Sequence, residues 1–223
     1  MGGGMSKTYI TSDIHGYYTL LMEKLKLINF DFNNDKLICI GDLVDRGVEN
    51  LECLSLLDES WFEATAGNHD VWCYEGLENP HSAFYHRMKN NGGEWWYHLD
   101  ADTQEYWSYR IRNLPLWKEL NFNGKRILFV HADVGNDGDV NNKYTNLHLW
   151  SRMSADGEFD TTVEDWDVVI HGHTPIQAID TEDCIKSDGF GNVWKCKDNR
   201  IYIDSGVFFS GKLNVIDLEE LLK

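Results

Sequence analysis

Short apolar runs that each end in a cluster of polar residues are the feature that most constrains how this chain can fold. Runs of four to six apolar residues are typical of strands buried inside a sheet. The clusters that follow the runs are Asp13–Gly16, Gly41–Gly47, Gly67–Asp70, His131–Asp133 and His171–Pro175. In α/β sheets, ligands bind beyond the carboxyl ends of the strands. The sequence therefore predicts that five strands deliver these side chains to one pocket.

Helical patterns separate the first apolar runs. Leucine and isoleucine repeat at helical spacing in residues 17–28, and leucine does so again in residues 48–57. This alternation of strands and helices predicts a layered α/β fold, with residues 80–113 mainly helical. The expected strands are Lys7–Thr11, Lys36–Ile40, Phe62–Ala66, Arg126–His131, Val168–His171, Arg200–Asp204 and Leu213–Asp217.

Nothing in the 223 residues marks a boundary between domains. The chain has no internal repeat and no proline-rich linker, since it contains only three prolines. We therefore expect residues 5–223 to form a single domain. Residues 1–4 are expected to be a remnant of recombinant expression ahead of a native start at Met5.

The charge of the chain excludes several classes of protein. Lys and Arg total 20 against 37 Asp and Glu, which gives a formal net charge of −17. An acidic chain without a basic run argues against binding nucleic acid through its phosphates. No apolar stretch approaches the roughly 18 residues of a membrane span, and no signal-peptide pattern opens the chain. We expect a cytoplasmic protein with neither nucleic acid nor membrane as partner, and the oligomeric state stays open.

The five cysteines are an odd number, far apart in sequence, and include no Cys-x-x-Cys pair. Cys39 lies within an apolar run, where a thiol packs as a small hydrophobic side chain. Zinc sites place their ligands in closer local pairs than these cysteines offer. We therefore expect reduced thiols, with neither a disulfide nor a structural zinc site.

The polar clusters contain the ligand types of a divalent metal centre. A mixture of aspartate, asparagine and histidine without cysteine suits Mn²⁺, Fe²⁺ or Zn²⁺. Asp13 and His15 are two residues apart, so on an extended chain their side chains leave from the same face. One carboxylate can bridge two ions about 3.5–4 Å apart. Together the two ions stabilise the attacking and the leaving oxygen of a phosphoryl transfer. Each cluster alone is typical of a turn, and their combination favours a metal site.

Taken together, the motifs resemble those of the metallophosphoesterase superfamily, and within it the phosphoprotein phosphatases of the Ser/Thr type. The small bacterial and phage members, typified by the bacteriophage lambda protein phosphatase, are the most similar. The motifs are Asp-x-His-Gly, Gly-Asp-x-Val-Asp-Arg-Gly, Gly-Asn-His, His-Ala and Gly-His-Thr-Pro, with further likeness in Asn91–Trp95 and Tyr202–Gly206. The resemblance implies a calcineurin-like fold, in which helices flank a central β-sandwich and metals bind at the carboxyl ends of strands.

The resemblance also implies the metal ligands. The first ion would be bound by Asp13, His15 and Asp42, and the second by Asp42, Asn68, His131 and His173. Among the two histidines of the last motif, His173 is assigned because the family ligand directly precedes Thr-Pro. Whether His171 touches metal stays open. Both ions are expected to be Mn²⁺, with Fe²⁺, Zn²⁺ and Mg²⁺ as alternatives.

The catalytic roles are likewise implied by the family. His69 would be the general acid that protonates the leaving oxygen, and Asp45 the carboxylate that orients its imidazole. Arg46 and Arg152 would bind phosphate oxygens, and Asn68 would contact substrate as well as metal. A hydroxide that bridges the two ions would attack phosphorus directly, without a phosphoenzyme.

The sequence departs from the family pattern at Asp70, where Glu is usual, and this leaves the geometry around the metal ligands in question. The remaining histidines His81, His86, His98 and His148 have no acidic partner at a recognisable spacing, so we expect them at the surface or in packing. The aromatic residues around Trp95 are expected to fill core, or alternatively to line a substrate groove.

The primary hypothesis is a phosphatase that hydrolyses phosphoserine and phosphothreonine in phosphoproteins or phosphopeptides, with phosphotyrosine as a further substrate. The first alternative is a symmetrical dinucleoside tetraphosphate hydrolase, because related hydrolases share the same ligands. The second alternative is a binding scaffold without catalysis. The presence of every implied ligand and of His69 argues against that scaffold.

Overall fold

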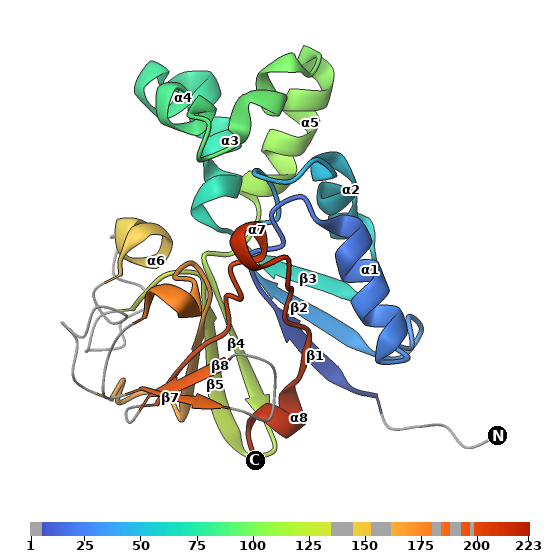
Figure 1. Ribbon diagram of the computed structural model, residues 1–223, viewed down its shortest axis with the longest axis vertical. Helices are drawn as coiled ribbons and strands as arrows, with labels where there is room; N and C mark the ends of the chain where they lie inside the picture. Colours follow the sequence, from blue (N-terminus) through green and yellow to red (C-terminus); the bar gives the residue numbers. More distant parts are fainter. Residues whose placement is uncertain (1–5, 135–144, 153–161, 180–183, 188–192, 197–198) are drawn as a thin grey trace.

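The computed structural model describes residues 6–134, 145–152, 162–179, 184–187, 193–196 and 199–223 (Figure 1). The first elements are β1 (Thr8–Thr11), α1 (Tyr18–Leu27), β2 (Lys36–Ile40), α2 (Asn50–Ser55), η1 (Leu56–Asp58), β3 (Phe62–Thr65), α3 (Asn68–Glu78), α4 (Pro80–Arg87), η2 (Gly93–His98) and α5 (Ala101–Arg112). They are followed by β4 (Trp117–Phe122), β5 (Lys125–Val130), α6 (Thr145–Trp150), β6 (Val168–His171), η3 (Ile176–Ala178), β7 (Cys184–Ser187), β8 (Val193–Cys196), β9 (Arg200–Tyr202), α7 (Val207–Ser210), β10 (Ile216–Asp217) and α8 (Leu218–Leu221).

The described strands form two sheets. One has four strands in the order β10-β1-β2-β3, in which β1, β2 and β3 are parallel. The other has six strands in the order β4-β5-β6-β9-β8-β7, in which β5, β6 and β9 are parallel. The register places Val130 beside His171 and His171 beside Tyr202. Each sheet therefore brings the carboxyl ends of three parallel strands to one edge.

The two faces of β2 explain how the layers pack. Leu37 and Cys39 belong to a core cluster shared with the helices, whereas Ile38 and Ile40 belong to a second cluster that includes Phe129 of β5. Because side chains alternate along a strand, one face of the four-stranded sheet packs on helices and the other on the six-stranded sheet. The result is a β-sandwich with helices outside it.

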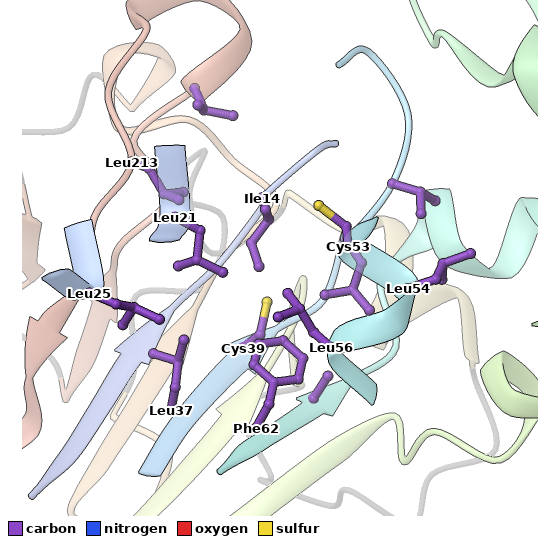
Figure 2. Close-up of a cluster of buried hydrophobic side chains, with 14 of the residues drawn as sticks. Ile14, Leu21, Leu25, Leu37, Cys39, Cys53, Leu54, Leu56, Phe62 and Leu213 are labelled. Atoms are coloured by element: carbon purple, nitrogen blue, oxygen red, sulfur yellow. The ribbon is translucent and has the colours of Figure 1, made fainter. Parts of the chain in front are cut away.

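Helices α1 and α2 cover the outer face of the four-stranded sheet (Figures 1 and 2). Leu21 and Leu25 of α1, together with Leu54 of α2, point at this face and are fully buried. Burying one such side chain contributes about 1.5–3 kcal/mol. Helices α3, α4 and α5 form a separate group beyond the carboxyl end of β3 (Figure 1), and this group lies above the strand ends that carry the polar clusters.

The layered α/β architecture predicted from the sequence is confirmed, and β2 and β6 have the predicted bounds. Strand β4 was not predicted; it pairs with β5 at the edge of its sheet and is only partly buried. Helix α3 was not predicted either, because residues 67–70 have the composition of a turn, whereas Asn68 begins a helix of 11 residues. Residues 1–4, with the predicted remnant of expression, lie outside the described residues.

The prediction of five reduced thiols is wrong. Cys39, Cys53 and Cys73 are free and buried, but Cys196 is disulfide-bonded. The antiparallel pairing of β7 with β8 sets the backbone of Cys184 directly opposite Cys196. Eleven residues separate these two cysteines in sequence, and strand register brings them together. Within the described part of the chain, no helix is long and apolar enough for a membrane crossing.

Candidate metal and phosphate site

The loops that follow the strands hold several side chains on left-handed backbone. Positive φ is uncommon outside glycine and marks positions that the surrounding structure must enforce. The site residues with positive φ are Asp13 (50°), His15 (50°), Asp42 (53°), Asp45 (75°), Arg46 (67°) and His173 (62°). Hydrogen bonds between the loops enforce this shape. The backbone N–H of Asp13 donates to Gly41 O at 3.0 Å, and that of His15 donates to Asp42 O at 3.0 Å.

Asp42, directly beyond β2, lies at the centre of the site. Its Oδ1 accepts the backbone N–H of His69 at 2.9 Å and lies 3.4 Å from Nε2 of His131. Its Oδ2 lies 3.6 Å from Nε2 of His15. Asp42 belongs to two groups of potential metal ligands, and within each group the ligand atoms lie within 4.8 Å of one another. The first group also contains His15 and His69, and the second also contains His131 and His173.

The remaining predicted ligands lie beside these groups. Asn68 Oδ1 lies 3.0 Å from Nε2 of His131. Both carboxylate oxygens of Asp13 accept the backbone N–H of His173, at 3.0 and 3.2 Å. The structure therefore brings all six predicted ligands together, although β1 and β2 belong to one sheet and β5 and β6 to the other.

The three predicted histidine ligands are oriented by backbone carbonyls. Nδ1 of His15 donates to Val44 O at 2.9 Å, and Nδ1 of His131 donates to Ile40 O at 2.9 Å. In His173 the two ring nitrogens exchange roles: Nε2 donates to Trp150 O at 3.3 Å, and Nδ1 is the nitrogen left for a metal ion. Since a carbonyl only accepts, each bond fixes the tautomer and leaves the other ring nitrogen unprotonated. That is the form of histidine that coordinates a metal ion.

Burial in this centre disfavours every uncompensated charge. Burial, with Asp204 and Asp42, raises the pKa of Asp13 well above its usual value. Burial and Asp70 likewise raise the pKa of Asp42. Burial lowers the pKa of His131 to about 3. Neutral imidazoles around buried carboxylates form a donor set that fits divalent cations, which would supply the missing positive charge.

Asp45 has no exposed surface and accepts hydrogen bonds from three side chains. His69 Nδ1 donates to its Oδ2 at 2.8 Å, and Trp95 Nε1 donates to its Oδ1 at 2.8 Å. His86 Nε2 lies 3.0 and 3.2 Å from the two carboxylate oxygens. Burial acts to raise the pKa of Asp45, but the hydrogen bonds from His69 and His86 outweigh it, so the pKa lies below its usual value. Asp45 is thus held as a carboxylate.

The prediction that His86 has no acidic partner is wrong. His86 lies on α4, is fully buried, and contacts Tyr97 Oη through Nδ1 at 3.1 Å in addition to Asp45. Gly93 makes room for it, because a Cβ at Gly93 would lie 1.9 Å from Cδ2 of His86. Of the other histidines, His81 and His98 are exposed, as expected, and His148 is buried. For His98 the predicted lack of an acidic partner is also wrong, because its Nε2 lies 3.6 Å from Oε1 of Glu94, four residues earlier.

The segment Asn91–Trp95 resembles the family in sequence, and the structure shows what this segment contacts. Trp95 donates to Asp45, and a Cβ at Gly92 would lie 2.3 Å from the backbone nitrogen of Arg46. The segment therefore packs directly beneath the carboxylate and the arginine of the neighbouring loop. Its resemblance to the family motif was the available signal for this contact.

Both predicted phosphate-binding arginines reach the site. Arg46 donates from Nη1 to Nε2 of His15 at 2.6 Å and from Nη2 to Nε2 of His69 at 3.1 Å. Arg152 donates from Nη1 to Thr174 Oγ1 at 3.1 Å and to His173 O at 3.3 Å. A small cavity of about 150 Å³ lies between them, lined by Asp42, Arg46, Asn68, His69, Trp72, Asn91, Trp150, Arg152 and His173.

Two residues left open by the sequence have defined places. His171 lies outside both ligand groups, with its Nδ1 donating to Ala132 O at 2.8 Å and its ring stacked on Tyr202 at 4.9 Å. Asp70 accepts the backbone N–H groups of Asp42, Leu43 and Gly67, each at 2.9 Å. Its shorter carboxylate therefore ties the start of α3 to the loop that carries Asp42.

The chain is similar to known phosphoesterases in sequence and in fold. The sequence profile of the calcineurin-like phosphoesterase family matches residues 6–204. Serine/threonine-protein phosphatase 2 of Salmonella typhimurium is 31% identical over 219 residues, which cover 95% of this chain and 92% of the relative. A symmetrical bis(5'-nucleosyl)-tetraphosphatase of Buchnera aphidicola is 28% identical over 70% of this chain and 54% of its own. A solved protein serine/threonine phosphatase of Saccharomyces cerevisiae shares the fold, with TM-score 0.56 and 12% identity over 89% of this chain and 67% of its own.

Proposed function

This chain belongs to the calcineurin-like phosphoesterase family, and from that premise we propose that it hydrolyses phosphoserine and phosphothreonine monoesters in phosphoproteins. The observation that carries the proposal is one small cavity that His69 and two arginines, Arg46 and Arg152, line together. A relative named as a serine/threonine-protein phosphatase, which matches along 95% of the chain, supports the same substrate class.

We assign two divalent ions to the centre, with Mn²⁺ as the expected metal and Fe²⁺, Zn²⁺ and Mg²⁺ as alternatives. Asp13, His15 and Asp42 would hold the first ion, and Asp42, Asn68, His131 and His173 would hold the second. The lone pairs left by the carbonyl-bound imidazoles support this assignment. When bound, the two ions supply an activated water and neutralise phosphate charge.

The side chains around the cavity account for binding and proton transfer. Arg46 and Arg152 present planar donors that match phosphate oxygens, and Asn68 adds an amide. His69 holds its Nδ1 on Asp45, so Nε2 is the atom that gives a proton to the leaving oxygen. The carboxylate of Asp45 stabilises the imidazolium that this transfer requires.

A panel assay with added Mn²⁺ tests the proposal. Phosphoserine, phosphothreonine and phosphotyrosine peptides are compared with nucleotides and diadenosine tetraphosphate, and a chelator-treated sample serves as the control. We expect release of phosphate from the phosphoserine, phosphothreonine and phosphotyrosine peptides. In the chelator-treated sample we expect no release of phosphate from any of them. Failure to hydrolyse any phosphopeptide with any divalent ion would reject the proposal.

Hydrolysis of a symmetrical dinucleoside tetraphosphate is the second candidate. A relative named for that activity, 28% identical over 162 residues, is the observation in its favour. The assay separates the two, because a preference of several orders of magnitude for diadenosine tetraphosphate would select this candidate. Absence of hydrolysis on every substrate, with metal bound, would leave a binding scaffold.

A further inference from the structure

A second and larger cavity adjoins the phosphate site. It measures about 580 Å³ and shares Arg46, Arg152 and His173 with the small cavity. Its other walls are formed by Thr174, Pro175, Gln177, Ala178, Phe209 and Ser210. Although the chain carries 37 acidic residues, none is among the described residues that line this cavity. Its surface therefore offers two cations and uncharged groups.

Phe209 forms an apolar wall of the large cavity. It lies on α7, between Gly206 and Gly211, and is 71% exposed. The helix is held in place, because Ser210 Oγ donates to Ser205 O at 2.9 Å and Gln177 Nε2 donates to Ser205 O at 3.0 Å. An exposed phenyl ring that lines a cavity on an anchored helix offers a contact for an apolar group.

The position of His69 decides which part of a substrate this cavity can take. A general acid must lie within about 2.6–3.2 Å of the oxygen that it protonates. His69 lines the small cavity and is not among the residues that line the large one. The leaving oxygen therefore belongs in the small cavity, and the large cavity takes a part of the substrate beyond the scissile bond.

We propose that the large cavity is a specificity site for an apolar side chain next to the phosphorylated residue of a peptide. This inference rests on the proposed function. Phe209, Pro175 and Ala178 provide the contacts, and the arginines join the cavity to the phosphate site. A basic flanking side chain meets two like charges there and no acidic group among the described lining residues, so the site selects against Lys and Arg.

The test uses two series of phosphoserine peptides, with Phe, Leu, Gly or Lys directly before or directly after the phosphoserine. The full chain is assayed with Mn²⁺, and p-nitrophenyl phosphate reports activity on a substrate without a flanking residue. In one of the two series we expect kcat/KM to be about tenfold higher for Phe than for Gly, which equals about 1.4 kcal/mol. We expect Lys to lie below Gly. Equal kcat/KM across both series would overturn the inference.

A pair of variants on α7 tests the assigned wall. We expect Phe209→Ser to bring the Phe-to-Gly ratio of kcat/KM close to one. Phe208→Ser is the matched control, since Phe208 is adjacent, 43% exposed and not among the lining residues. A ratio retained in Phe209→Ser, or lost equally in Phe208→Ser, would contradict the assignment.

The outcomes separate this inference from the function on which it rests. No hydrolysis of either the peptides or p-nitrophenyl phosphate rejects the proposed function and the inference with it. Hydrolysis of both without any flanking preference rejects only the inference. Hydrolysis of diadenosine tetraphosphate with a KM that rises in Phe209→Ser, without a peptide preference, would assign the cavity to a nucleobase instead.

Discussion

The two sides of the site are built differently. The N-terminal side, from the loops after β1, β2 and β3, contains Asp42, Asp45 and His69, which hydrogen bonds join to one another and to the backbone. The C-terminal side, from the chain after β5, contains Arg152 and Phe209, which are both exposed. Five of the six site residues with positive φ lie on the N-terminal side, and His173 lies on the other.

This difference suggests a division of labour, in which the N-terminal side carries out the reaction and exposed residues of the C-terminal side bind the substrate. On the N-terminal side, each carboxylate has several partners, so a shift of one group disturbs the others. On the C-terminal side, exposed side chains surround a larger cavity, and such positions tolerate change because few contacts depend on them. We expect substitutions on the N-terminal side to lower kcat. On the C-terminal side, we expect substitutions of exposed residues, as opposed to the assigned ligands His131 and His173, to alter KM and substrate preference.

Asp42→Asn should have the largest effect, because Asp42 belongs to both groups of ligand atoms and joins the two sides. Loss of partners that merely orient ligands costs 10–100-fold, so loss of a shared ligand should lower kcat by more than about 100-fold. Metal analysis should show less than two ions per chain. Two retained ions with unchanged kcat would show that the sides do not meet at this carboxylate.

His69→Asn should come next, with metal content unchanged. General acid catalysis contributes about 10²–10⁴-fold when the leaving group is poor. We expect a loss of at least about 100-fold in kcat on a phosphoserine peptide and a much smaller loss on p-nitrophenyl phosphate, whose leaving group needs little protonation. Equal losses on the two substrates would remove His69 from this role.

His86→Gln tests whether the N-terminal side extends into α4. Because His86 reaches the site through Asp45, we expect about a tenfold loss in kcat with little change in KM. Gly93→Ala should act in the same direction, since its Cβ would displace the His86 ring. His81→Gln is the control on the same helix and is exposed. A rise in KM without a loss in kcat would contradict a positioning role.

Arg152→Ala should have the smallest effect and should fall mainly on KM. Its guanidinium contacts only described groups of the C-terminal side, Thr174 and His173 O, and it is exposed. An exposed charged contact contributes about 1 kcal/mol, which corresponds to roughly a fivefold rise in KM for a phosphopeptide. A loss confined to kcat would place Arg152 with the N-terminal side.

How far the sequence could predict the molecule depends on the distance between partners. Strand ends and their clusters were predictable, because an apolar run and the polar residues after it are adjacent in the chain. The partners of Asp45 were not, since His86 lies 41 residues away and Trp95 lies 50 residues away. Cys196 was mistaken for the same reason, because register rather than spacing determines what lies opposite it.

The exposed position of Phe209 beside the cavity was not predictable for another reason. Its neighbours in sequence, Val207 and Phe208, give the pattern of a short apolar segment, and nothing in that pattern distinguishes a buried ring from an exposed one. Left-handed Gly206 and Gly211 bound α7, and the fold brings its Phe209 to the same cavity as the two arginines. The cavity itself is formed by segments far apart in the chain.

The left-handed backbone of the site has a consequence for how freely these positions can vary. Aspartate, asparagine and histidine are the side chains that adopt positive φ most readily after glycine, and they are also the oxygen and nitrogen ligands of divalent ions. Selection for foldability and selection for metal binding therefore favour the same few residue types at Asp13, His15, Asp42 and His173. Glycine is the replacement that should survive a screen for folded protein and fail a screen for activity. Arg46 stands apart, because its φ of 67° lies in the same left-handed region although arginine is not among the side chains that adopt this region readily.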